Sequence, residues 1–150
     1  MLKLGKKVQY ALVAMFHLDR VALPGTRVTT RELSLRYGIP EQHLGKVLQR
    51  LGRAGVLTSV QGVQGGYELH RSLRDITLGD VMNAVDGVRT PKKRDTHTIL
   101  TAFPACYVQG LTHEVERNVV ERVHEMRLSE VLNPLDFPQS SPQNSLEATG

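Results

Sequence analysis

Cysteine and long apolar runs are scarce in this chain of 150 residues. One cysteine, Cys106, cannot form an intramolecular disulfide, which agrees with a reducing compartment. No apolar run approaches the roughly 18 residues of a membrane span. The N-terminus also lacks the apolar core and the small-residue cleavage site of a secretory signal. We therefore expect a cytoplasmic protein that does not bind a membrane.

Catalytic motifs are missing as well. The chain has no Gly-x-Ser-x-Gly, no phosphate-binding loop, no His-Glu-x-x-His and no Cys-x-x-Cys. Residues 62–66 are rich in glycine, but no Lys-Ser or Lys-Thr follows them, and they lead into an expected strand instead of a helix. The histidines are scattered and Cys106 is the only thiol, whereas structural zinc usually takes four protein ligands. We expect neither an enzyme nor a metal site.

Two regions of opposite charge make up the modest net charge of +4. Residues 1–94 carry 16 Lys or Arg against 7 Asp or Glu, a net charge of +9, and the remaining 56 residues carry 3 against 8, a net charge of −5. A basic first part suits a polyanionic partner, and DNA, RNA and a membrane surface are all polyanions. Charge alone does not choose among them.

The first part of the chain has the pattern of consecutive helices. Apolar residues recur at a helical period over residues 8–23, and Pro24 follows that helix as a breaker. Thr29-x-x-Glu32 is a capping box, in which the hydroxyl accepts from a free backbone N–H and the carboxylate reaches back to the cap. It predicts a short helix over residues 30–37.

A further helix follows after a tight turn. Gly38 supplies the permissive backbone for that turn, Pro40 presets a first helical position, and Gly55 ends the helix. The buried stripe of this helix consists of Leu44, Val47, Leu48 and Leu51. Two helices joined by a turn of about three residues form a helix-turn-helix, whose second helix can enter a DNA major groove.

A hairpin is expected directly after the helix-turn-helix. Residues 56–60 have the pattern of a strand, residues 62–66 are too rich in glycine for regular structure, and Tyr67 and Leu69 resume the alternation. A hairpin this small is not stable alone, so it must pack on the helices, which we expect to involve Val60, Tyr67 and Leu69. A hairpin in this position is the wing of a winged helix.

A long amphipathic helix is predicted in the second part of the chain. A capping pattern, Thr77-x-x-Asp80, first begins a helix that Gly87 ends. Residues 106–126 then carry an apolar stripe formed by Val108, Leu111, Val115, Val119, Val123 and Met126. The stripe is too narrow for a membrane and too long for a compact domain of about 90 residues to cover. Its expected partner is the same helix of a second subunit.

Polar side chains opposite the buried stripe are candidates for contact with double-stranded DNA. Gln and Arg can pair with base edges, whereas Lys mostly neutralises phosphate. In the wing, glycines let backbone N–H groups approach a phosphate, and glutamines can enter a minor groove. The alternatives are a solvated helix face and a merely structural hairpin tip. The predicted contacts are Thr30, Gln42, His43, Lys46, Gln49 and Arg50 in the helices, and Gln61, Gln64, Gly65 and Tyr67 in the wing.

The order of these motifs resembles the Rrf-two (Rrf2) family of bacterial winged-helix regulators over roughly residues 1–132. The most specific matches are Tyr10-Ala11-Leu12, Leu51-x-x-Ala54-Gly55-Val56-Leu57, Gly62-x-x-Gly65-Gly66-Tyr67-x-Leu69, Ile76-Thr77-Leu78-x-Asp80-Val81 and Ala84-Val85-Asp86-Gly87. Relatives include regulators that sense iron–sulfur clusters, nitric oxide or cysteine metabolism. The resemblance implies a homodimer joined by the long helix, a palindromic operator and a sensing loop ahead of that helix.

The sensing loop departs from that resemblance. In cluster-binding members it carries three cysteines, of which Cys106 resembles the third, but the positions near Arg94 and Leu100 hold no thiol. Gln109 stands where a histidine is often found, and Gln9 where some members have an acidic ligand. We therefore expect no cofactor, since a single cysteine argues against an iron–sulfur cluster of the usual kind.

The DNA-reading elements depart from it too. Many relatives have Glu where this chain has Gly45, and Arg where it has Gln61. Operator preference should therefore differ from theirs. Glycine inside a helix also costs roughly 1 kcal/mol against alanine, which the apolar stripe must offset.

The predicted fold class is mainly α with a small β-hairpin wing: a winged helix-turn-helix followed by a long C-terminal dimerisation helix. The predicted parts are a DNA-binding domain over 1–87, a sensing-type loop over 88–104, a dimerisation helix with a short terminal helix over 105–132, and a disordered tail over 133–150. The leading hypothesis is a homodimeric, sequence-specific transcription regulator, most simply a repressor. The alternatives are a redox or metal sensor acting through Cys106 and a winged helix used as a protein-interaction module.

Overall fold

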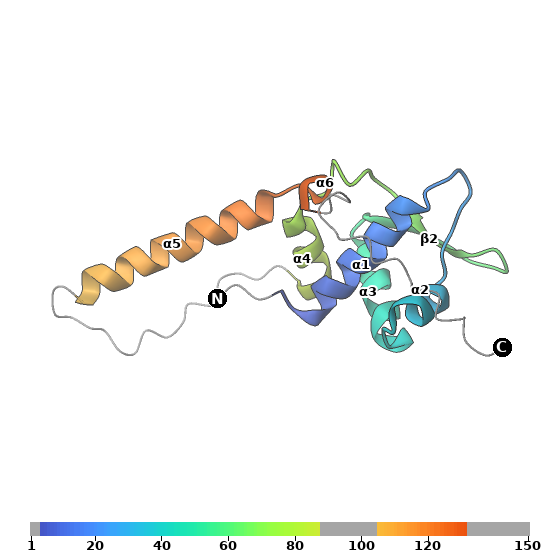
Figure 1. Ribbon diagram of the computed structural model, residues 1–150, viewed down its shortest axis with the longest axis horizontal. Coiled ribbons are helices and arrows are strands. Elements are labelled where there is room, and N and C mark those ends of the chain that lie inside the picture. Colours follow the sequence, from blue (N-terminus) through green and yellow to red (C-terminus); the bar gives the residue numbers. More distant parts are fainter. Residues whose placement is uncertain (1–3, 88–104, 132–150) are drawn as a thin grey trace, which may run out of the picture.

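The computed structural model describes residues 4–87 and 105–131, with side chains from residue 114 onward in the second stretch. The predicted loop over 88–104 and the predicted tail over 133–150 lie outside the described residues. The elements are α1 (Lys6–Arg20), α2 (Thr30–Tyr37), α3 (Glu41–Arg53), β1 (Leu57–Val60), β2 (Gly66–Leu69), α4 (Leu78–Asp86), α5 (Ala105–Glu125) and α6 (Leu128–Val131). Figure 1 shows α5 projecting from a compact head, which comprises α1 to α4, the β1–β2 hairpin and α6.

The first helix ends earlier than its apolar pattern predicts. The sequence indicates residues 8–23, whereas α1 runs over Lys6–Arg20. Val21 has left the helical conformation, with φ −100° and ψ 7°, although its N–H still donates to the His17 carbonyl. Leu23 is 72% exposed, so extending the helix to this residue would bury little apolar surface.

Both predicted capping boxes are present. The Thr29 hydroxyl accepts from the Glu32 backbone N–H at 3.2 Å, while the Glu32 carboxylate accepts from the Thr29 N–H at 2.7 Å. Thr77 and Asp80 repeat this arrangement at the start of α4. Between α2 and α3, Gly38 has φ +63°, a left-handed conformation that glycine adopts without steric cost. The helix-turn-helix prediction is thus confirmed in its local geometry.

The third helix lies at the centre of the head and packs against α1, α2 and α4. Its apolar stripe is fully buried, as predicted, with Leu44, Leu48 and Leu51 each 0% exposed. The opposite face of α3 is exposed. One helix therefore stabilises the core with one face and presents polar side chains with the other.

One glycine in α3 has room for a side chain. A Cβ atom added at Gly45 would meet only Thr30 Cγ2, at 3.8 Å, which is ordinary van der Waals contact. We expect Gly45→Ala to raise the free energy of unfolding by about 0.5–1 kcal/mol, because alanine loses less backbone entropy in a helix. Urea denaturation measures the change, and an unchanged or lower stability would contradict the expectation. Gly38→Ala, at positive φ, should instead lower it.

The hairpin is antiparallel and is tied to the head by its backbone. Its register pairs Leu57 with Leu69 and Val60 with Gly66. On the far side of β2, Tyr67 exchanges two backbone hydrogen bonds with Val28, of 3.0 and 2.8 Å. Tyr67 and Leu69 pack against the core as predicted, whereas Val60 is half-buried at the end of β1.

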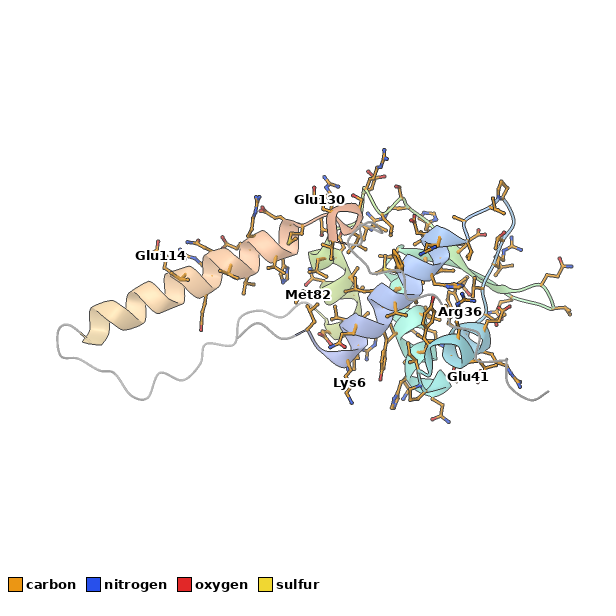
Figure 2. The ribbon with its side chains drawn as sticks, in the orientation of Figure 1. Lys6, Arg36, Glu41, Met82, Glu114 and Glu130 are labelled. Atoms are coloured by element: carbon orange, nitrogen blue, oxygen red, sulfur yellow. The ribbon has the colours of Figure 1, made fainter. Side chains whose placement is uncertain are left out.

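Backbone hydrogen bonds connect the segment after α5 to the start of α4. The Leu78 N–H donates to the Met126 carbonyl at 2.8 Å, and the Leu128 N–H donates to the Ile76 carbonyl at 2.9 Å. Leu128, in α6, is completely buried in the core of the head. Beyond this junction α5 stands clear of the head, as the labelled Glu114 shows in Figure 2. The four residues of α6 thus belong to the head, although they follow the long helix.

Candidate nucleic-acid interface

Four predicted contacts lie together on the exposed face of α3. Gln42, His43, Lys46 and Gln49 are all exposed, and they recur at helical spacing opposite the buried stripe. All four side chains can donate to base edges and phosphates, and the glutamines and a neutral histidine can also accept from base edges. This face is the candidate nucleic-acid interface of the head.

Arg50 is placed differently from these four residues. Its guanidinium Nη1 donates to the carbonyl of Val85, in the last turn of α4. A cation at the C-terminal end of a helix satisfies a carbonyl that has no partner within that helix. Arg50 therefore connects α3 to α4, and its contact with DNA stays a prediction that must involve its other donor groups.

The N-terminal end of α2 carries a negative charge close to the interface. The pKa of Glu32 is lowered because the Thr29 backbone N–H and the Thr29 hydroxyl both donate to its carboxylate. Thr30, another predicted contact, is half-buried beside Gly45. Because a carboxylate already occupies this helix end, we expect Lys46 to be a better phosphate contact than the start of α2.

A histidine joins α2 to α1 behind the interface. His17 Nδ1 lies 2.8 Å from the Tyr37 hydroxyl, and the two rings meet edge to face with centroids 5.6 Å apart. Burial lowers the pKa of His17, and the positive charge of Arg36 lowers it further. The neutral ring therefore dominates at pH 7 and holds the end of α2 against α1.

The predicted wing contacts divide into two exposed and two structural residues. Gln61 and Gln64 are exposed, whereas Gly65 donates its N–H to the Gly62 carbonyl at 2.9 Å and closes the turn. Tyr67 is half-buried by its packing on the head. Between the two glutamines lies Val63, which is fully exposed and was not among the predicted contacts. Its position in a two-glutamine turn is the only sequence signal that marks it.

Metal ligands do not gather in the part of the chain that the structure describes: no three His, Cys, Asp or Glu side chains lie close enough together to hold an ion. Cys106 falls in the first turn of α5, and its side chain is outside the described residues. Among the described helices none is long and apolar enough to cross a membrane.

The chain is similar in sequence to known transcriptional regulators. Residues 4–134 match the family model Rrf2, described as an iron-dependent transcriptional regulator. The chain is similar to a protein named as an rrf2-like HTH-type transcriptional regulator of Rhodobacter capsulatus, with 33% identity over 88 residues, 57% of this chain and 59% of that protein. It thus spans little more than half the length of that relative.

Two further likenesses extend over most of the chain. The HTH-type transcriptional regulator IscR of Vibrio atlanticus is 28% identical over 148 residues, 97% of this chain and 84% of that protein. The structure of CymR, the global cysteine regulator of B. subtilis, matches with a TM-score of 0.68 and 25% identity, covering 88% of this chain and 97% of CymR. The predicted winged-helix fold and the family resemblance are confirmed by these likenesses.

Proposed function

The chain belongs to the Rrf2 family of transcriptional regulators, and on this premise we propose that it binds specific DNA sequences and regulates transcription in the cytoplasm. The observation that carries the proposal is the division of α3 into a buried apolar face and an exposed face with Gln42, His43, Lys46 and Gln49. The second helix of a helix-turn-helix, held in this way, can enter a major groove and read base edges.

We propose further that the regulator is a homodimer. Apolar side chains on α5 and directly after it remain uncovered in the single chain: Val115, Val119 and Val120 on the helix, and Met126 just beyond its end, are 36–53% exposed. Since α5 stands clear of the head, a second copy of the same helix is the simplest cover for this stripe. Two heads related by a two-fold axis would meet a palindromic operator in successive major grooves, and occupancy of a promoter by such a dimer would repress transcription.

In vitro selection from a random duplex pool tests this function and identifies the operator in the same experiment. Fluorescence anisotropy then compares the selected duplex with a scrambled one at two salt concentrations. We expect tighter binding to the selected duplex and two chains bound per duplex. Equal affinity for both duplexes would rule out specific regulation, and a lack of binding to either would favour the protein-interaction module.

Lys46→Gln separates phosphate contact from base reading. We expect binding to the selected and the scrambled duplex to weaken alike, by about fivefold per contact near 0.15 M salt, and the salt slope to fall by about one for each Lys46 that meets a phosphate. Arg117→Gln, at an exposed position on α5, is the matched control and should leave both quantities unchanged. A lysine variant with the full salt slope would show that Lys46 does not face the backbone of DNA.

The donor set of this chain does not fit an iron–sulfur cluster, although the family description mentions iron. Protein-bound clusters are normally held by cysteine thiolates, most often four, and the sequence contains one. The described residues supply no alternative group of ligands. Sensing through the thiol of Cys106 stays a prediction, and the proposed DNA binding does not depend on it.

A further inference from the structure

Val63 is the most exposed of the large apolar side chains in the described residues, at 107% of its reference surface. It lies in the turn between β1 and β2, at the tip of the hairpin. A fully exposed valine contributes nothing to the core and leaves apolar surface in water. Its position suggests contact with a partner that the hairpin meets.

The backbone holds this valine in its exposed position. The Gly65 N–H donates to the Gly62 carbonyl at 2.9 Å and closes the turn around Val63 and Gln64. A Cβ atom at Gly65 would collide with the carbonyl oxygen of Val60, so the turn is as tight as glycine permits. A further Cβ atom at Gly66 would lie 2.9 Å from the Val28 carbonyl oxygen. This closed turn presents Val63 to solvent at the apex of the hairpin.

The surroundings of Val63 are polar but carry no charge. From residue 54 to residue 67 the sequence has no Lys, Arg, Asp or Glu, and the exposed polar side chains nearest Val63 in sequence are Gln61 and Gln64. Without Lys or Arg, the tip offers phosphates only amide and backbone N–H donors, and Val63 itself can contact DNA only through apolar surface in a groove. Amide side chains around an apolar one are instead suited to a minor groove, where glutamine reads base edges and apolar groups contact sugars and bases.

We propose that Val63 is the minor-groove contact of the wing, where it packs on an A·T-rich segment of the operator between the amides of Gln61 and Gln64. The proposed DNA binding is a premise of this assignment. In the minor groove a G·C pair differs from an A·T pair by the projecting N2 amino group of guanine, which would obstruct an apolar side chain at the floor of the groove. Val63 thus gives the wing a preference for A·T without contributing to the salt dependence of binding.

The test uses the full chain and the duplex selected by the wild-type protein. Affinities of wild type, Val63→Ala and Val63→Ile are measured at two salt concentrations by anisotropy. Because Val63 is fully exposed, neither substitution should change the melting temperature. We expect Val63→Ala to bind roughly 3- to 15-fold more weakly with an unchanged salt slope, since the lost contact is apolar. Val63→Ile, which keeps the apolar surface, should retain wild-type affinity.

Base substitution in the segment under the wing locates the contact. Replacing A·T by G·C there should weaken wild-type binding, and replacing it by inosine·C, which lacks the guanine N2 amino group, should restore it. Val63→Ala should respond much less to these changes. Wild-type affinity in Val63→Ala, or a wild type indifferent to the amino group, overturns the assignment while leaving the proposed function intact. A wild type that binds no duplex overturns both.

Discussion

Replacing Leu128 with alanine is expected to lower the free energy of unfolding by about 2–5 kcal/mol. The side chain is 0% exposed, and its backbone N–H donates to the Ile76 carbonyl at 2.9 Å. Alanine would therefore leave a cavity inside the head, at the point where the chain returns from α5. Urea denaturation at one fixed protein concentration measures the loss, because the stability of the proposed dimer would depend on concentration.

Leu35→Ala is the matched control for Leu128→Ala. It is the same substitution on another short helix, at a side chain that is 76% exposed, and it should change the free energy of unfolding by less than about 0.5 kcal/mol. Similar small effects of both variants would mean that α6 does not contribute to the core of the head.

Gly79→Ala is expected to destabilise the protein by about 1–3 kcal/mol through overpacking at the junction of α4 and α5. A Cβ atom at this position would lie 2.8 Å from the backbone oxygen of His124 and 2.9 Å from its Nδ1. A flexible side chain could move away, but the carbonyl of an adjoining helix can move only if the helix does. The variant should therefore change the orientation of α5 relative to the head as well as the stability of the protein. Small-angle X-ray scattering measures the resulting change in overall shape.

Gly52→Ala is the control, and it should change the free energy of unfolding in the opposite direction. The glycine lies in α3, where an added Cβ would find its nearest neighbour, the Leu57 carbonyl oxygen, at 3.9 Å. Alanine is favoured over glycine there by about 0.5–1 kcal/mol, so this variant should be more stable than the wild type. If Gly79→Ala were stabilising too, the close approach of α4 and α5 would not constrain the junction.

Features determined by neighbouring residues were the predictable part of this fold. The capping boxes at Thr29 and Thr77 each need a partner only three residues away, and both occur where the sequence indicates them. The buried stripe of α3 follows directly from helical spacing. The start of α2, the turn at Gly38 and the buried and exposed faces of α3 were therefore accessible to sequence reasoning.

Features determined by distant residues were not predictable in this way. Helical spacing groups Arg50 with the outward polar residues, but its partner, Val85, is 35 positions away, and only tertiary packing reveals that bond. The last turn predicted for the first helix is absent because Leu23 finds no core to enter. Val63 has the residue type of a core position, yet it lies fully exposed in the turn that the Gly65 N–H closes. In each case packing against a remote segment, or the lack of it, decides the outcome.

The return of the chain to the head at Leu128 also sets an order of events during synthesis. Ile76 and Val85 are made about 40 to 50 residues before Leu128, which at ribosomal rates of about 5–20 residues per second is a delay of roughly 2–10 s. Until Leu128 is made, the nascent head lacks one of its completely buried side chains and the N–H group that donates to the Ile76 carbonyl. Its core closes only after α5 has been translated. The head is therefore completed only with the long helix already attached, so the proposed pairing surface is present as soon as the head is folded.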